Sequence, residues 1–170
     1  MQWDMPQSDD SDWKRHQSIA SQQFLRDLRT AEAHLRARGL ERVPIRGDDN
    51  NCQFRTLAAF YNHANVTHDA IRQLIVDYIL AHAEQFRVDV EIGLGYPSLE
   101  QYCAEMRRSG TWGDGVTLMA FALMQNVNIE VCTASGFAEL YPGPGRPRMA
   151  VVCVGEHYEA TRLRPVTGDA

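Results

Sequence analysis

The chain has 170 residues, which is enough for one compact domain with its own hydrophobic core. Hydrophobic residues make up 44% and charged residues 23% of the sequence, as in an ordinary globular protein. The net charge of −5 disfavours nucleic acid and anionic membrane surfaces as partners, because both attract basic proteins.

The first part of the chain is predicted to be a polar tail followed by one long helix. Residues 1–12 are polar and acidic, which is typical of a disordered tail. Apolar side chains recur at helical spacing over residues 13–38, and Gly39 stands where a helix C-cap would. We therefore expect residues 13–41 to form an N-terminal helix that packs on the domain. A short extended segment at 43–45 and a polar loop follow.

Four further helices are predicted between the polar loop and residue 125. The second helix begins at Cys52, and Thr67 caps the third. Ser98 opens the fourth helix with a capping-box pattern, and the turn at 112–115 leads into a fifth helix over 116–125. The apolar stripe of the third helix consists of Ile71, Leu74, Ile75, Tyr78 and Ile79.

The last third of the chain changes to a strand pattern. Four strands are predicted, at residues 128–133, 138–141, 149–154 and 158–163. Helices first and strands later predict an α+β fold, with helices packed around a small, mostly antiparallel sheet. The aromatic residues Phe54, Tyr61, Phe86 and Trp112 are interpreted as members of the core.

Cys52 is the first candidate for a chemical role. It occupies the first turn of a helix, directly after a polar loop, whereas Cys103, Cys132 and Cys153 lie within apolar segments as structural cysteines do. The unpaired N–H groups and the dipole of a helix N-terminus favour negative charge, so they stabilise a nucleophilic thiolate. The same N–H groups can hold an oxyanion.

His157 is the candidate for the base that such a thiol needs. Unlike the other five histidines, it follows an apolar strand and a short turn, and it opens a new strand. Alternation along that strand places His157 and Glu159 on the same face, where the carboxylate could orient the imidazole through Nδ1. Taken alone, the pair could also be an ordinary surface histidine beside a solvated glutamate.

Four blocks of the sequence, in order, resemble the ovarian tumour (OTU) family of cysteine proteases. The segment DNNCQFR at 49–55 is similar to the family signature DGNC(L/Q)FR. It is followed by WGD at 112–114 with the helix after it, NIEV at 128–131 and HY at 157–158. The resemblance implies a papain-like α+β catalytic domain over 42–163, with 164–170 as a tail. It also implies hydrolysis of peptide or isopeptide bonds at the C-terminus of ubiquitin.

The resemblance assigns roles to individual residues. Cys52 would be the nucleophile and His157 the general base. Glu159 stands where the family has Asp or Asn as the third member of the triad, and Asp49 is the alternative for that part. The backbone amides of Asp49, Asn50 and Cys52 would form the oxyanion hole. Asn50 replaces a family glycine, and Asn is the best substitute where the backbone needs a positive φ.

Trp112 and Gly113 would support this site without taking part in the chemistry. The implied partners are ubiquitin or polyubiquitin chains, and no cofactor is expected. The glycine pairs at 93–95 and 143–145 lack the Lys-Ser/Thr of a phosphate loop, and no residue spacing indicates zinc. The four cysteines form no CxxC pair, and the sequence has no span for a bilayer and no secretory signal, so we expect free thiols in the cytoplasm.

Three alternatives stay open. The chain could be a catalytically weak OTU-fold domain that only binds ubiquitin, or another papain-like thiol hydrolase such as a peptidoglycan amidase. It could also be a fragment of a larger polyprotein or effector.

Overall fold

A computed structural model of the chain describes residues 10–61, 65–140 and 142–166, with side chains described from residue 20 onward. Of the segments predicted above, residues 1–9, Tyr141 and residues 167–170 lie outside this part of the chain. The first helix begins at Asp10, so residues 10–12, which were expected in the tail, are helical.

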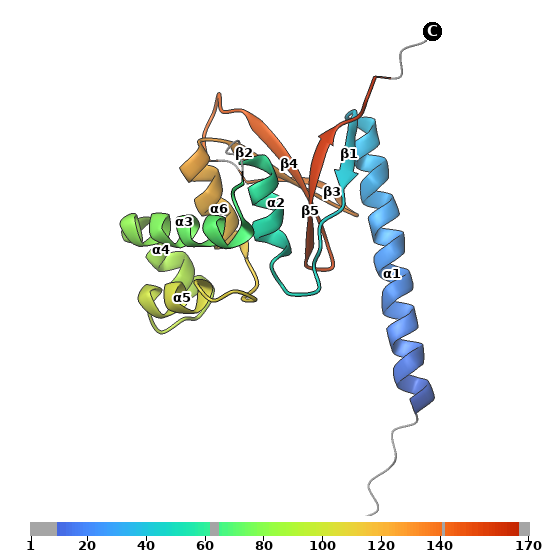
Figure 1. Cartoon of the computed structure of the whole chain (residues 1–170), viewed down its shortest axis with the longest axis horizontal. Coiled ribbons are helices and arrows are strands. Elements are labelled where there is room, and N and C mark those ends of the chain that lie inside the picture. The colour runs from blue at the N-terminus through green and yellow to red at the C-terminus, as the bar shows by residue number, and fades with distance from the viewer. Residues whose placement is uncertain (1–9, 62–64, 141, 167–170) are drawn as a thin grey trace, which may run out of the picture.

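Figure 1 shows helices at both sides of a twisted sheet. The helices are α1 (Asp10–Ala37), α2 (Cys52–Phe60), α3 (His68–Ala81), α4 (Ala83–Val88), α5 (Leu99–Met106) and α6 (Gly115–Gln125), and a π-helical turn (Asp89–Gly93) follows α4. The predicted caps are confirmed: the Thr67 hydroxyl accepts a hydrogen bond from the amide of Ala70, and that of Ser98 from the amide of Gln101.

Five strands form one sheet in the order β1-β5-β4-β2-β3. They are β1 (Leu40–Val43), β2 (Asn128–Thr133), β3 (Gly136–Leu140), β4 (Arg148–Val154) and β5 (His157–Leu163). The β2–β4 pair is parallel and the other three pairs are antiparallel, which confirms the predicted α+β class with a mostly antiparallel sheet.

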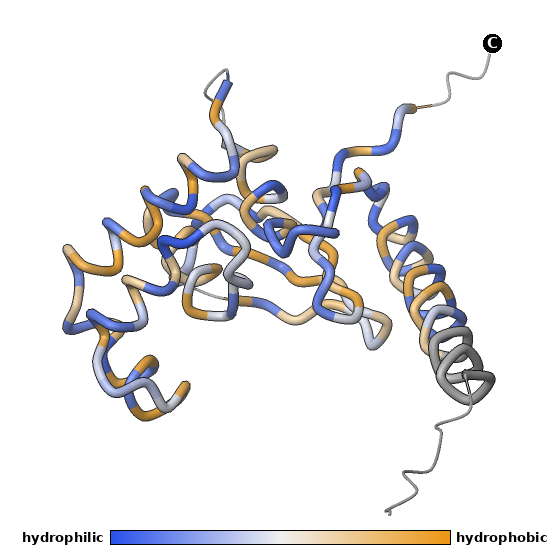
Figure 2. Tube along the Cα trace, turned by 60° about the horizontal axis from the view of Figure 1, so that its bottom comes forward, coloured by the Kyte–Doolittle hydropathy of each residue, from blue (hydrophilic) through white to orange (hydrophobic). Residues whose placement is uncertain are grey.

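Strand alternation divides the core into two layers. Ile129 and Val151 point to the face that α2–α6 cover, where they join the larger cluster of buried side chains. Cys132 of β2 and its cross-strand partner Val152 of β4 point to the other face, where Leu28, Ala31 and Leu35 of α1 cover them. Apolar residues recur along α1 between polar ones (Figure 2), which is why one side of this helix can be buried.

Two expectations about the core were wrong. Trp112 is 50% exposed and belongs to the surface, because it lies in the loop before α6 rather than in a helix or strand. In α3, Leu74 is 40% exposed, whereas Arg72 is fully buried because its guanidinium bonds interior oxygens. Apart from the core, the sequence analysis also missed one element, the helical segment from Ala83 to Gly93.

No helix within the described ranges combines the length and the hydrophobicity that a bilayer crossing requires.

Candidate active site

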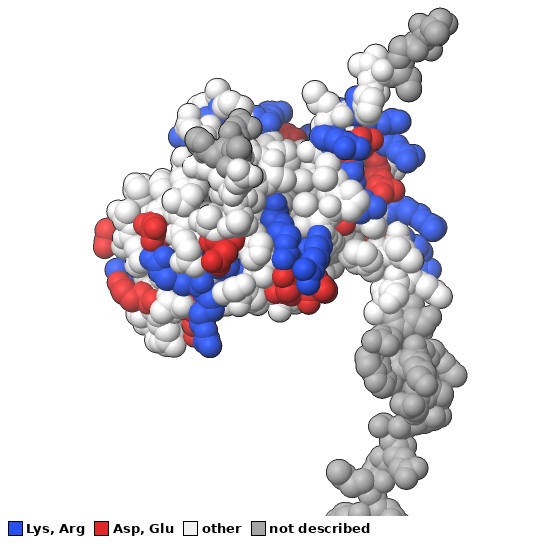
Figure 3. Space-filling model, in the orientation of Figure 1, with Lys and Arg blue, Asp and Glu red and all other residues white. Residues whose placement is uncertain are grey.

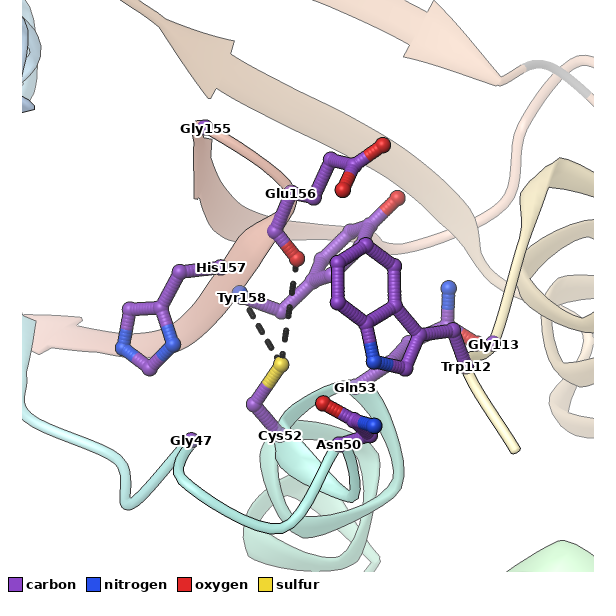
Figure 4. Close-up of a pocket in the computed structure, with 10 residues that line it drawn as sticks. All are labelled: Gly47, Asn50, Cys52, Gln53, Trp112, Gly113, Gly155, Glu156, His157 and Tyr158. Carbon is purple, nitrogen blue, oxygen red and sulfur yellow. Dashed lines mark hydrogen bonds between the residues drawn. The ribbon is translucent and has the colours of Figure 1, made fainter. Parts of the chain in front are cut away.

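A cleft opens between the start of α2, the loop before α6 and the turn from β4 to β5 (Figure 4). Its lining consists of Gly47, Asn50, Cys52, Gln53, Trp112, Gly113, Gly155, Glu156, His157 and Tyr158. Cys52 lies between His157 and Trp112 in this cleft. The structure therefore brings together three of the residues selected from the sequence, namely Cys52, His157 and Asn50.

Cys52 is the first residue of α2 and is 8% exposed. Its Sγ accepts a hydrogen bond from the backbone amide of Tyr158 at 3.4 Å. The thiol also makes a long contact of 3.9 Å with the carbonyl oxygen of Glu156. The β4–β5 turn thus holds the sulfur at the cleft, at a helix N-terminus whose first N–H groups lack intrahelical partners.

The loop before α2 has the backbone conformation that the sequence comparison suggested. Asn50 has a φ of +62°, in the left-handed region that Asn tolerates better than other residues with a side chain, as expected for a residue that replaces glycine. The Asn50 amide donates a long hydrogen bond of 3.5 Å to the carbonyl oxygen of Gly47. This turn exposes Asn50 to the cleft next to Cys52.

His157 and Glu159 form a hydrogen-bonded pair along β5. Nε2 of the imidazole lies 3.0 Å from Oε1 of Glu159, so the expected pairing is present, but the expectation that it involves Nδ1 was wrong. The Nδ1 side of the ring is occupied by Gly47, where an added Cβ would lie 2.3 Å from Nδ1 and 3.6 Å from the Cβ of Cys52. The ring therefore presents Nδ1 toward the loop that immediately precedes Cys52 (Figure 4).

Glu159 has a second partner that the sequence did not reveal. Arg42 of β1 donates to both carboxylate oxygens, at 2.9 and 2.6 Å, and its Nε donates to Glu32 of α1 at 3.0 Å. Glu159 is 4% exposed, so the guanidinium supplies hydrogen bonds that solvent cannot supply there. This contact could not be predicted from local sequence patterns, because 117 positions separate the two residues.

Asp49 forms an ion pair with Arg55. Its two oxygens accept hydrogen bonds from the two terminal nitrogens of Arg55, each at 2.5 Å, and Oδ1 accepts a third from the amide of Asn51. The hydrogen bonds from Arg55 hold the pKa of this carboxyl far below its ordinary value. Its described contacts brace the loop before Cys52, whereas the carboxylate on the imidazole is that of Glu159.

The residue before the cysteine is tied to the interior. Oδ1 of Asn51 accepts hydrogen bonds from Arg72 at 2.7 Å and from the amide of Gly110 at 2.9 Å. Arg72 is fully buried, donates to the carbonyl of Met106 and stacks its guanidinium 3.9 Å from the centre of the Phe54 ring. These contacts fix the start of α2 against α3 and α5. The sequence signal for this contact is the position of Arg72 directly beside Ile71 of the apolar stripe of α3.

Gln53 connects the start of α2 to the start of α6. Its buried side chain donates to the carbonyl of Asp114 at 3.0 Å and accepts from the Thr117 hydroxyl at 2.6 Å. A Cβ on Gly113 would lie 2.1 Å from Oε1 of Gln53, so this close approach requires glycine. Trp112 and Gly113 thereby form the wall of the cleft opposite His157 (Figure 4).

The other three cysteines lie in environments that favour the neutral thiol. Burial raises the pKa of Cys103 to about 11, and it also raises the pKa values of Cys132 and Cys153. All four cysteines are free. Within the described part of the chain, no three His, Cys, Asp or Glu side chains are grouped as they would be around a metal ion.

Comparison with known proteins gives consistent matches. "Putative ubiquitin thioesterase 232R" of Invertebrate iridescent virus 3 is 28% identical over 132 residues, which cover 72% of this chain and 16% of that protein. "Ubiquitin thioesterase otu2" of Schizosaccharomyces pombe is 31% identical over 104 residues, 58% of this chain and 34% of that protein. The chain thus spans at most about a third of these relatives' length.

The fold matches as well. The solved OTU domain of OTUD1 superposes with a TM-score of 0.69 and 23% identity, covering 82% of this chain and 96% of that domain. A family model described as "OTU-like cysteine protease" matches residues 48–147, which include Asn50, Cys52 and the Trp112–Gly113 wall. The chain belongs to the family of OTU-like cysteine proteases.

Proposed function

We propose that this chain is a deubiquitinase, a thiol-dependent hydrolase of peptide and isopeptide bonds at the C-terminus of ubiquitin. The observation that carries the proposal is the cleft in which Cys52, at a helix N-terminus, faces an imidazole held by Glu159. That arrangement supplies a nucleophile, a base and an orienting carboxylate. The relatives named as ubiquitin thioesterases support ubiquitin as the substrate.

In the first half of the proposed reaction, His157 takes the proton of the Cys52 thiol and the sulfur attacks the carbonyl carbon of ubiquitin's C-terminal glycine. The tetrahedral oxyanion accepts hydrogen bonds from the backbone amides of Asp49 and Asn50 in the loop before α2 and of Cys52 at its first residue; for this the Asn50 amide gives up its long hydrogen bond to the carbonyl of Gly47. The carbon–nitrogen bond then breaks, and the lysine amine leaves with the proton that the imidazolium returns. Ubiquitin stays on Cys52 as a thioester.

In the second half, a water molecule attacks the thioester while His157 accepts its proton. The carbon–sulfur bond breaks, ubiquitin leaves with a free carboxylate, and the Cys52 thiol is restored. Glu159 keeps the imidazole in one orientation and stabilises its charged form in both halves. We expect no cofactor, since the chain itself supplies the nucleophile and the proton carrier.

We further propose that the protein works in a reducing, cytoplasmic setting on ubiquitin or polyubiquitin chains. The free state of all four cysteines supports a reducing compartment.

The proposal is tested by incubating the protein with a panel of di-ubiquitins of different linkage and with a probe that carries a reactive group at the C-terminus of ubiquitin. We expect cleavage of at least one linkage and covalent capture of Cys52, located by mass spectrometry. Binding of ubiquitin without cleavage or capture would instead indicate a non-catalytic ubiquitin-binding domain. Inertness toward every ubiquitin substrate, with hydrolysis of another amide such as a peptidoglycan peptide, would indicate a different thiol hydrolase.

A further inference from the structure

We propose that Arg42 is a positioning residue of the active site, which holds the carboxylate of Glu159 and directs it to His157. Glu32 of α1 holds Arg42 in turn, so the orientation of the base depends on two elements that lie before the span of the matched family model. The inference rests on the proposed function for its kinetic test, but the contacts themselves do not.

The contacts form one connected chain of charged groups. Oε1 of Glu159 lies 3.0 Å from Nε2 of His157 and 2.9 Å from a terminal nitrogen of Arg42. The same nitrogen lies 2.6 Å from Oε2, so the arginine holds both carboxylate oxygens. The guanidinium is fixed from its other side by Glu32, through Nε at 3.0 Å.

The side chain of Glu159 needs a partner that restrains its carboxylate. This side chain has one more rotatable bond than the Asp or Asn that the family resemblance predicts at this position, so more orientations are open to its carboxylate. Glu159 is also buried, so its carboxylate oxygens depend on protein donors for their hydrogen bonds. Arg42 meets both needs, because one of its terminal nitrogens donates to both carboxylate oxygens and so restrains the carboxylate.

The strand register places Arg42 at a distance from Glu159 that only a long side chain can span. Arg42 is the cross-strand partner of Thr161, which lies two residues beyond Glu159 on the same face of β5. Diagonal neighbours of this kind are roughly 7–8 Å apart at Cα, within reach of an arginine. Glu41, which directly precedes Arg42 on β1, faces the opposite side of the sheet and pairs with Arg162.

Helix α1 also contacts the base directly. The ring of Phe24 lies edge-on to the imidazole of His157, with the ring centres 6.3 Å apart. His157 is therefore held by a carboxylate at Nε2 and by an aromatic ring from α1. Side chains of both signs meet on the surface where α1 and β1 come together (Figure 3), and the Glu32–Arg42 ion pair joins this helix to the domain in addition to its apolar face.

The test is a double-mutant cycle on the whole chain, read as kcat and KM for a ubiquitin substrate with a fluorogenic C-terminal group. We expect Arg42→Gln to lower kcat at least about tenfold with little change in KM, because the imidazole is misoriented while ubiquitin still binds. In a Glu159→Ala background the same change should cost less than about twofold, since Arg42 acts through Glu159. Arg42→Lys keeps the positive charge but cannot bond Glu32 and Glu159 through two separate nitrogens. It should therefore lose less activity than Arg42→Gln.

Arg162→Gln is the matched control, because it removes the other ion pair between β1 and β5 without touching the carboxylate of Glu159. It should leave kcat near that of the wild type. An Arg42→Gln variant as active as this control would overturn the inference, and so would an equal loss in the presence and absence of Glu159. If Arg42→Gln folds poorly, Arg42→Lys takes its place in the cycle.

A second measurement separates this inference from the proposed function. The rate at which iodoacetamide alkylates Cys52 near neutral pH requires no ubiquitin and reports how well His157 supports the thiolate. Arg42→Gln should slow it at least about threefold and Arg162→Gln should not. A wild type that cleaves no ubiquitin substrate would end the proposed function, and the alkylation rates would then decide the role of Arg42 alone.

Discussion

The carboxylate of Glu159 reaches Nε2 of His157 at 3.0 Å, although glutamate replaces the shorter residue that the family resemblance predicts. The two residues are alternate members of β5 and so share one face of the sheet, as expected from strand alternation. The extra methylene is accommodated because Arg42 holds the carboxylate from its other side. Glu159, rather than Asp49, is therefore the candidate for the third position of the triad.

Replacement of Glu159 by alanine should impair turnover without abolishing it. We expect kcat/KM to fall more than about tenfold, roughly 1.4 kcal/mol of transition-state stabilisation, because the imidazole loses its orienting carboxylate. The remaining activity should come from Cys52 and the backbone amides of the loop. Steady-state kinetics with a fluorogenic ubiquitin substrate measures the loss.

Asp49→Ala belongs in the same series of measurements. Its carboxylate pairs with Arg55, so we expect this variant to lose stability and to retain more activity than Glu159→Ala. The reverse ranking would transfer the third position to Asp49. Near wild-type activity of both variants would leave a Cys–His dyad as the better description.

Gly47→Ala should disturb the base directly. An added Cβ would lie 2.3 Å from Nδ1 of His157, so either the ring or the loop must move. We expect at least about a tenfold loss in kcat/KM, since a displacement of about 1 Å near the reacting groups is already costly. Gly93→Ala is the control, because its added Cβ would meet nothing within 4 Å. Equal activities of the two variants would contradict the packing of Gly47 on His157.

Cys52 should be the thiol that reacts first with iodoacetamide near neutral pH. Burial raises the pKa values of Cys103, Cys132 and Cys153, which keeps these three as unreactive thiols. Cys52 instead lies at a helix N-terminus in the cleft. Peptide mass spectrometry after brief labelling identifies the modified residue, and faster labelling of any other cysteine would count against Cys52 as the nucleophile.

The Asp49–Arg55 ion pair should make stability depend on acid pH. The pKa of Asp49 is lower in the folded chain than in the unfolded one, where it is about 3.9. The stabilisation is therefore complete above that value and is lost as the pH falls toward the folded pKa. The Asp49 side chain is 33% exposed, so the effect should be modest. The difference in Tm between the wild type and Asp49→Asn should shrink from pH 7 to pH 3; an unchanged difference would refute this assignment.

Local patterns in the sequence were sufficient for most elements and for the reacting groups. Helix caps such as Thr67 and Ser98 are read from neighbouring residues, and the strands from alternation over a few positions. Cys52 and His157 were identifiable because each stands at the beginning of an element after a polar turn. The positive φ at Asn50 also followed from a local comparison with glycine.

Contacts between distant segments could not be predicted in the same way. Arg42 reaches Glu159 only because β1 pairs with β5, and nothing near either residue indicates that pairing. The burial of Arg72 depends likewise on oxygens of Asn51 and Met106, which lie outside its helix. Trp112 was assigned to the core from its hydrophobicity alone, whereas its loop holds it at the edge of the cleft.

The role of Cys52 as nucleophile is tested by comparing the hydrolysis of di-ubiquitin by the wild type and by Cys52→Ala. The substitution removes only a sulfur at the start of α2, so circular dichroism should show an unchanged fold. Cys103→Ala, Cys132→Ala and Cys153→Ala serve as controls that should stay active, with some loss of stability from core truncation. We expect complete loss of cleavage for Cys52→Ala alone, and full activity in that variant would exclude Cys52 as the nucleophile.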